Sequence, residues 1–404
     1  MSESASLLRK RDSRDDGKVT MVELFFDLVF VFAITQLSHR LLAHLDLLGA
    51  AQTALLLFGV WWVWIYTSWV TNWLDPERTP VRLLLFALML AGLVLSASIP
   101  EAFGERRLAF IGAYVGMQVG RTLFFLWAVR AESIARRRNF QRILVWLVVS
   151  GALWIGGAFL DGSARFACWA TALVIEIIGP AMYFFVPGLG RSSAEDWDVD
   201  GAHIAERCGL FVIIALGESL LVTGATFAER SWDATTISAF VIAFLGSVAM
   251  WWAYFDSGAE RASHRIEHSE DPGRLARTAY TYLHVIIIAG VLVCAVADEL
   301  VLVHPGHADG AGIAAILGGP ALYLIGNALF KWVTNDRKGP PLSHLIGLAL
   351  LLVVTPFAHA VSALVLGAFT TLCLMLVAAW ETLALRGPTH LPAKADSAGR
   401  DRKT

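Results

Sequence analysis

Apolar residues along this chain arrive in blocks of about 20, separated by short charged stretches. In amphipathic helices or strands, the apolar residues would instead recur with periods of 3.6 or 2 residues. A block of about 17 to 25 apolar residues spans the hydrocarbon core of a bilayer, and its backbone must be helical because lipid offers no hydrogen-bond partners. The pattern therefore predicts an all-α, polytopic membrane protein with twelve transmembrane helices. They are predicted at 22–42, 50–74, 82–101, 108–129, 141–160, 166–187, 205–227, 234–256, 278–303, 311–333, 343–358 and 360–385.

Composition strengthens the membrane assignment. Of the 404 residues, 56% are hydrophobic and 16% charged, against about 25% charged in a soluble domain. An ordinary soluble enzyme is excluded, and a net charge of -2 gives no basic surface for nucleic acid. The four cysteines all fall inside apolar blocks, so neither a disulfide framework nor a metal pair is predicted. The lipid bilayer is the first predicted partner.

The positions of lysine and arginine predict the topology, since short cytoplasmic loops carry the positive excess. Of the 32 basic residues, 26 lie on the side of the two termini, 5 lie on the other side, and Arg121 alone lies within a span. Both termini are therefore expected in the cytoplasm. No cleaved signal peptide is evident, and residues 1–20 are predicted to form a solvated tail.

The two halves of the chain resemble each other in four places, which occur in the same order in both. The matching stretches are 33–36 with 215–218, 64–66 with 252–254, 91–101 with 289–299, and 120–124 with 326–330. Because six spans is an even number, a duplication would give two parallel six-helix repeats related by an axis along the membrane normal. The predicted divisions are a tail at 1–20, a first repeat at 21–187, a linker at 188–203, a second repeat at 204–386 and a tail at 387–404.

Charged residues inside spans are the main functional candidates, since each costs about 2.5–3.5 kcal/mol near the bilayer centre. Glu23 and Asp27 are four residues apart and share one helix face near the cytoplasmic entrance. Glu23 could also simply cap its helix, whereas Asp27 is interpreted as a buried functional carboxylate or one half of an ion pair. Gln36 and His39 are further polar residues, toward the outer end of the same span.

The seventh span carries a second polar group. It opens with His203, Glu206 and Arg207 and continues to Glu218 and Ser219. Glu218 lies twelve residues beyond Glu206, or roughly 18 Å into the bilayer. The sequence allows two interpretations: Glu218 is a protonatable or cation-binding carboxylate, or it is a structural partner of neighbouring helices.

The sequence leaves several roles open for Arg121 and for the acidic residues at the outer ends of the spans. Arg121 could neutralise Glu218, Asp27 or Glu176, attract an anionic substrate, or snorkel to the interface. Its counterpart in the second half is the neutral Asn327. Glu101 and Glu299 lie at the outer ends of their spans. They form either an acidic vestibule or ordinary solvated loop edges.

Other features point to no chemistry of their own. Pro180, Pro320 and Pro356 fall within spans and mark either broken helices at a binding site or ordinary kinks. No nucleophile elbow, phosphate loop or metal-ligand spacing occurs, so catalytic residues, metal and cofactor are all predicted as none.

Two motifs together resemble the bacterial low-temperature-requirement A family. They are the stretch from Glu23 to His39 and the stretch from Glu206 to Ser219, with Cys208 where an aromatic residue is expected. The resemblance runs from about Val22 to Leu385 and implies a multi-pass protein of the bacterial inner membrane. It does not imply a defined activity.

The first span is also similar to the first helix of six-helix-repeat potassium channels that carry a Phe-Ser-Asp motif. Phe26 stands in place of the serine, and the seventh span has Gly209 in place of the aspartate. These departures do not favour a channel filter built from that motif.

The leading hypothesis is a transporter or permease for a small solute or ion, proton-coupled through Glu218. Alternatives are an ion channel, or an intramembrane enzyme or lipid-handling scaffold that uses His203, His359 and the ends at Glu101 and Glu299. The sequence is compatible with a homo-oligomer and names neither the substrate nor the direction of transport.

Overall fold

The computed structural model describes residues 6–9, 18–193, 200–256, 272–334 and 339–385. Within these ranges the chain is all-α, and twelve helices are long and apolar enough to cross a membrane. This confirms the predicted fold class and number of spans. The short α10 (Pro272–Ala276) belongs to the same span as α11 (His284–Val303). The other helices are α1 (Met21–Ala43), α2 (Leu47–Trp73), α3 (Thr79–Ser98), α4 (Arg107–Ala128), α5 (Ile134–Gly157), α6 (Gly162–Ala181), α7 (Gly201–Ala228), α8 (Ala234–Phe255), α12 (Gly310–Thr334), α13 (Leu342–Val354) and α14 (Ala363–Leu385).

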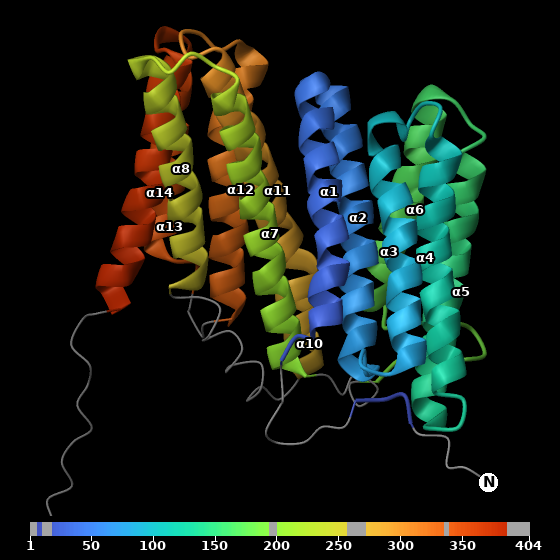
Figure 1. Ribbon diagram of the computed structural model, residues 1–404. Coiled ribbons are helices and arrows are strands. Elements are labelled where there is room, and N and C mark those ends of the chain that lie inside the picture. The colour runs from blue at the N-terminus through green and yellow to red at the C-terminus, as the bar shows by residue number, and fades with distance from the viewer. Residues whose placement is uncertain (1–5, 10–17, 194–199, 257–271, 335–338, 386–404) are drawn as a thin grey trace, which may run out of the picture.

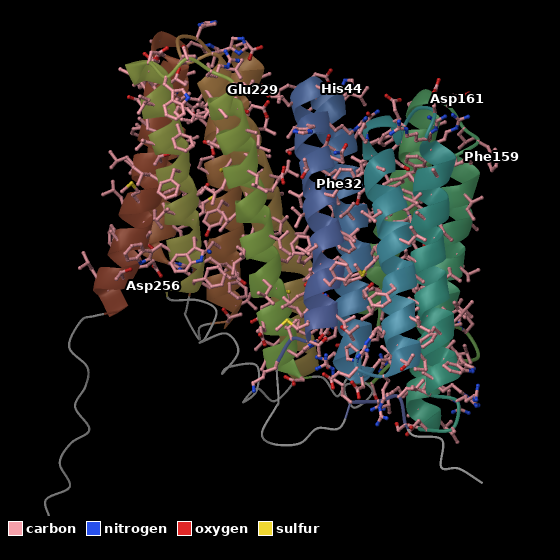
Figure 2. All side chains as sticks on the ribbon, in the orientation of Figure 1. Phe32, His44, Phe159, Asp161, Glu229 and Asp256 are labelled. Carbon is pink, nitrogen blue, oxygen red and sulfur yellow. The ribbon has the colours of Figure 1, made fainter. Side chains whose placement is uncertain are left out.

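The helices stand side by side in two groups (Figure 1). One group holds α1 to α6 and the other holds α7 to α14, with α1 and α7 next to each other where the groups meet. We call the end at which α1 begins and α14 ends the base, and the opposite end the top. Figure 2 shows His44, Asp161 and Glu229 at the top, whereas Asp256 lies toward the base.

Polar residues fix where several helices begin. The Thr20 side chain accepts a hydrogen bond from the Glu23 backbone N–H, and the Glu23 carboxylate accepts one from the Thr20 N–H, which makes a capping box. The prediction that Glu23 caps α1 is therefore confirmed. The Asp233 side chain caps α8 by accepting from the Thr236 backbone N–H, and this hydrogen bond holds the pKa of the Asp233 carboxyl below its usual value.

Each group is held together by a set of neighbouring helix pairs. In the first group α1 packs against α2 and α3, α3 against α4, α4 against α5, and α5 against α6, while α2 also contacts α4 and α6. In the second, α7 packs against α8 and α11, α11 against α12, α12 against α13, and α13 against α14, while α8 also contacts α12 and α14. The groups meet through α1 and α2 on one side and α7 and α11 on the other.

The beginning of α11 reaches into the first group. It is preceded by a π-helical segment, η3 (Arg277–Leu283). The indole N–H groups of Trp61 and Trp69 donate to the carbonyl and the hydroxyl of Thr281, at 2.8 and 3.0 Å. The Tyr282 hydroxyl donates to the Ile177 carbonyl at 2.8 Å. The widened turn thus ties the second group to α2 and α6.

Proline does not break the helices as one interpretation of the sequence expected. α12 continues through Pro320, and Pro180 lies next to the last residue of α6. Pro356 lies in a short 3₁₀ turn, η4 (Thr355–Ala360), that follows α13. Within the described residues, the spans that contain Pro100 and Pro356 end in 3₁₀ turns, whereas the π segment η3 contains no proline.

Close contact between α11 and α12 depends on glycine. A side chain added at Gly319 would meet the Cys294 backbone nitrogen at 2.8 Å, whereas nothing lies within 4 Å of the same atom at Gly318. We expect Gly319→Val to lower the free energy of unfolding by about 1–3 kcal/mol through overpacking, measured on detergent-purified protein. Gly318→Val is the matched control, since it carries the same helix-propensity cost; equal losses in both variants would contradict the close contact.

Candidate functional site

A buried ion cluster lies at the base, where α1, α2 and α7 meet. Arg207 of α7 donates to Asp27 Oδ1 at 2.5 Å and to Glu23 Oε1 at 3.1 Å, and all three side chains are fully buried. Trp64 of α2 donates its indole N–H to the same Asp27 oxygen at 2.8 Å. The Arg207 guanidinium also lies 5.6 Å from the Trp64 ring centre. The predicted ion pair of Asp27 thus joins the two groups of helices.

The amino-terminal segment supplies a second cation to this cluster. Arg9 lies 2.8 Å from Glu23 Oε2 and donates through Nε to the Thr71 carbonyl at 2.9 Å. Its backbone N–H donates to the Trp73 carbonyl, so this short segment is fastened to the base end of α2. Arg9 was counted with a solvated tail, and this was wrong for Arg9. Residues 18–20 lead into α1, and residues 1–5 and 10–17 of the tail lie outside the described residues.

Hydrogen bonds assign the proton on His203. The Asn72 amide oxygen accepts from the Asp200 backbone N–H, so its nitrogen is the atom 3.2 Å from His203 Nδ1. Because that nitrogen can only donate, Nδ1 accepts and Nε2 carries the proton. Nε2 lies 2.9 Å from Glu23 Oε1 and donates to it. Arg9 Nη2 also lies 3.2 Å from Nε2, and because both nitrogens carry hydrogen it donates to Glu23 instead. His203 is therefore a neutral donor to Glu23.

The charges of the base cluster balance. Two carboxylates, on Glu23 and Asp27, face two guanidiniums, on Arg9 and Arg207. A buried ion group is tolerated only when every member is paired, so the cluster fixes how α1 and α7 sit at the base. Two atoms remain without a partner, Asp27 Oδ2 and Arg207 Nε.

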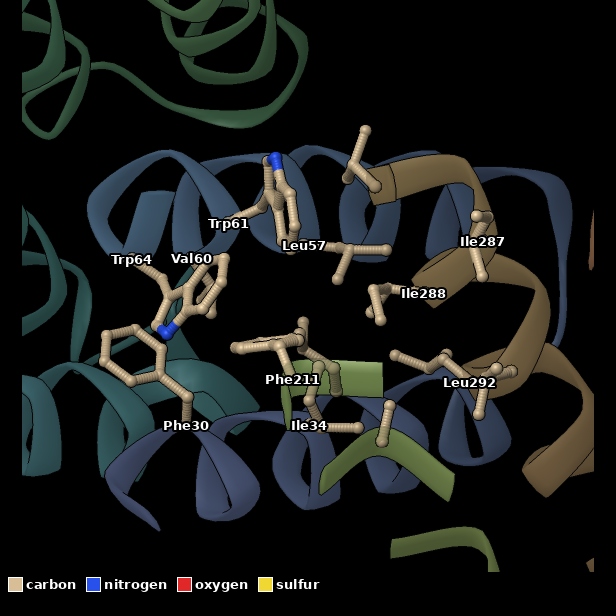
Figure 3. Packing of buried hydrophobic residues seen from close by; sticks show 14 of the residues in the cluster. Phe30, Ile34, Leu57, Val60, Trp61, Trp64, Phe211, Ile287, Ile288 and Leu292 are labelled. Atoms are coloured by element: carbon tan, nitrogen blue, oxygen red, sulfur yellow. The ribbon is translucent and has the colours of Figure 1, made fainter. Parts of the chain in front are cut away.

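Along α1 and α7, an apolar layer follows the ion cluster, and Figure 3 shows how its side chains pack. Phe211 of α7 is at its centre, with ring centres 4.4 Å from Trp64, 5.4 Å from Trp61 and 6.4 Å from Phe30. These four side chains are at most 1% exposed. Further apolar residues of α1, α2 and α11 extend the layer, namely Ile34, Leu57, Val60, Ile287, Ile288 and Leu292. The layer separates the base cluster from the polar groups nearer the top.

The polar groups above the layer come from α1, α7 and α11. Glu218 is buried, lies within hydrogen-bonding reach of the Thr35 hydroxyl and is close enough to His39 for charge interaction. Ser219 is a hydrogen-bonding partner of the Asp298 carboxyl and lies 3.5 Å from the Ser247 hydroxyl. Glu218 is eleven residues, or about 16 Å, beyond Arg207 along α7.

The structure separates the remaining predicted residues. Gln36 and Glu299 are half-buried on the same side of the apolar layer as Glu218, and His39 is exposed there. Glu101 is exposed at the top end of α3. Glu206 is exposed at the base, where its carboxylate accepts from the Val19 backbone N–H at 3.3 Å. The predicted polar interior is thus two clusters, one at each side of the apolar layer.

Arg121 belongs to neither cluster. It lies inside the first group of helices, where it donates to the Val63 carbonyl, to Thr67 Oγ1 at 3.0 Å and to Gln118 Oε1 at 2.5 Å. The other end of the Gln118 amide donates to Glu176 at 3.1 Å. Of the partners considered for Arg121, only Glu176 lies in this network, and it does so through Gln118.

A further buried network lies in the second group and was not predicted. Lys331 of α12 is 3.3 Å from Glu381 of α14, whose carboxylate also accepts from Ser343 at 2.6 Å. His344 connects Ser343 to Asn327 at 3.1 and 3.0 Å. Lys331 was counted with the loop cations, although it lies two residues before the end of the predicted span 311–333, and Glu381 lies inside the span 360–385. These two charges are the signal that would have found the network.

The geometry offers little to the catalytic alternative. His203 lies at the base, whereas Glu101 and His359 lie at the top end of their helices, so these residues do not converge. Among the described residues, no group of three or more His, Cys, Asp or Glu side chains could hold a metal ion.

A twelve-helix membrane bundle with a charge-balanced ion cluster between its two groups defines a class of polytopic integral membrane protein. The chain belongs to the bacterial low temperature requirement A protein (LtrA) family, whose model matches residues 18–379. It is 41% identical over 388 residues to an uncharacterized protein of Rhizobium meliloti (strain 1021), covering 96% of this chain and 94% of that protein. No solved structure matches the chain.

Proposed function

We propose that this protein is a transporter of a small solute or ion that works by alternating access between its two groups of helices, with protons coupled through Glu218. The observation that carries the proposal is the arrangement along α1 and α7. A paired ion cluster at the base and the buried Glu218 carboxylate above it lie on opposite sides of the apolar layer. Ion pairs that bridge two helix groups can open and re-form, which lets the groups rock about the layer.

Glu218 is the best placed proton carrier. It is a buried carboxylate in a span, and its neighbours Thr35 and His39 can both exchange hydrogen bonds or protons. A buried carboxylate close to such groups can take up and release a proton at modest cost, which is the chemistry that coupling needs. Asp298, joined through Ser219, would be the adjacent site for a proton or a cation.

We further infer that the two groups are parallel six-helix repeats, 21–187 and 204–386, joined by a linker at 188–203. The helix pairs that contact each other in α1 to α6 recur in the same order in α7 to α14. The four matched stretches of sequence support the same division. Such repeats supply the two bodies that rock in alternating access.

We infer that the base faces the cytoplasm, with both termini on that side. The support is the 26 of 32 basic residues assigned to this side by the sequence. In this orientation the ion cluster closes the cytoplasmic side, and Glu218 belongs to the outward half. The location proposed is therefore the bacterial inner membrane.

The test is proton flux into proteoliposomes that contain a trapped pH-sensitive dye, under inward gradients of protons, sodium or potassium. We expect flux in the wild type and loss to the level of protein-free liposomes in Glu218→Gln, because the amide cannot carry a proton. Glu229→Gln, at an exposed position just after α7, is the matched control and should keep wild-type flux.

Two results would count against the proposal in different ways. Wild-type flux in Glu218→Gln would remove this residue from coupling while leaving transport intact. An absence of flux in wild-type vesicles under all three gradients, with correctly folded protein, would contradict transport of those ions.

An ion channel is the second candidate, and the apolar layer is the observation that favours it. Hydrophobic constrictions gate channels by excluding water, and Phe30 and Phe211 face each other from α1 and α7. The two functions differ in their dependence on concentration. A current that does not saturate with the driving salt would indicate a channel, whereas saturation would support a transporter.

A further inference from the structure

A small cavity lies between the first group of helices and η3, apart from the ion cluster and the apolar layer. Its volume is about 30 Å³, which is the space of one water molecule or one small ion. It is bounded by side chains of α2, α4, α5 and the base end of α6, together with η3. The residues that matter here are Tyr66, Trp69, Trp73, Arg121, Arg277 and Thr281.

Arg121 brings to this cavity a positive charge that, among the described residues, makes no direct ion pair. Its side chain is fully buried, and its partners in the described ranges are a carbonyl, a hydroxyl and an amide, all neutral. Its Nε has no hydrogen-bond partner. The Tyr66 ring covers the guanidinium at 5.5 Å. A buried cation in a span needs a counter-charge, and these contacts do not supply one.

Glu176 is near enough to Arg121 for charge interaction, but in the described ranges Gln118 stands between the two and they form no direct ion pair. The Glu176 carboxylate accepts from Tyr114 at 2.7 Å, Ser150 at 2.8 Å, Trp154 at 3.0 Å and Gln118 at 3.1 Å, so both oxygens are engaged by their own donors. Glu176 is also absent from the cavity wall.

The rest of the wall is also suited to a negative ion. Arg277 of η3 adds a second cation, and among the described residues no aspartate or glutamate lines the cavity. The Thr281 oxygen accepts from Trp69 at 3.0 Å, which leaves the hydroxyl hydrogen free to donate. A water molecule would satisfy hydrogen bonds here but would leave the charge of the wall unbalanced.

We propose that this cavity binds one small monovalent anion, with chloride the ion of matching size, between Arg121, Arg277 and Thr281. Since Arg121 belongs to α4 and the other two to η3, the bound anion would fasten the beginning of α11 to the first group. The site does not involve Glu218 or the apolar layer, so it stands or falls independently of transport.

Thermal unfolding of the detergent-purified protein tests the site, with chloride titrated against gluconate at constant ionic strength. We expect the unfolding temperature to rise with chloride and to saturate, because an ion that binds only the folded state stabilises it by mass action. Iodide should quench part of the tryptophan fluorescence over a similar saturable range, since Trp69 and Trp73 line the cavity.

Arg121→Gln and Arg277→Gln should each weaken the apparent chloride affinity by about tenfold or more, through loss of a charge-assisted contact. Arg277 is only half-buried, so its variant will fold even if the first does not. Arg165→Gln is the control, since Arg165 is buried in the same group but pairs with Asp161 at 3.0 Å outside the cavity. Equal unfolding temperatures in chloride and gluconate, or an unchanged chloride response in Arg277→Gln, would overturn the proposal.

Discussion

Replacing Arg207 by glutamine is expected to destabilise the folded protein by about 3–5 kcal/mol, or to prevent its accumulation in the membrane. The substitution leaves Asp27 with the Trp64 N–H alone and Glu23 with Arg9 and His203. A buried carboxylate without a counter-charge is the costly state. The measurements are the yield of monodisperse protein and its unfolding midpoint in detergent.

If Arg207 acts through its ion pair, neutralising its partner as well should reduce the loss of stability. Arg207→Gln combined with Asp27→Asn should recover much of the lost stability, since the pair then becomes neutral on both sides. Arg78→Gln removes a partly exposed pair with Asp75, at 3.4 Å, and should cost less than about 1 kcal/mol. If Arg207→Gln were as harmless as Arg78→Gln, the cluster would not hold the two groups together.

Replacing Phe211 by glutamine is expected to raise passive ion or proton leak through the protein roughly tenfold or more. The apolar layer excludes water, and a polar side chain at its centre lowers the cost of hydration; about 1.4 kcal/mol is enough for this factor. Phe211 packs against Trp61, Trp64 and Phe30, so no other single residue touches as much of the layer. The measurement is dye-reported leak in proteoliposomes without a substrate gradient.

A control on the same helix separates leak from loss of packing. Phe227 lies near the other end of α7, stacked on Phe240 at 4.4 Å and on Trp232 at 5.0 Å. Phe227→Gln should therefore leave the leak unchanged even if stability falls. An unchanged leak in Phe211→Gln, with folded protein, would show that the barrier lies elsewhere.

Local sequence was sufficient to predict the membrane spans. Each span is a local property, because twenty apolar residues in lipid must satisfy their own backbone hydrogen bonds whatever the neighbouring helices do. The same locality made the capping role of Glu23 predictable from Thr20 three residues earlier. It also identified Asp27, Arg207 and Glu218 as residues whose charge requires a reason.

Pairing between helices was much harder to predict. Arg121 was considered as a partner for Glu218, Asp27 or Glu176, and the structure gives it none of them directly. Arg9 and Trp64 gave no signal, because one belongs to a polar tail and the other to a tryptophan-rich span. Their roles arise from which helix ends meet at the base.

The sequence by itself determined that this chain is a polytopic membrane protein and which of its charges are out of place in lipid. Only the tertiary structure decided that Asp27 binds Arg207 across 180 residues of chain, that an apolar layer isolates this pair from Glu218, and that Arg121 faces a separate cavity. The physical reason is that hydropathy is summed along one helix. An ion pair instead depends on how two helices are rotated and where they touch. The local sequence of either helix does not encode this.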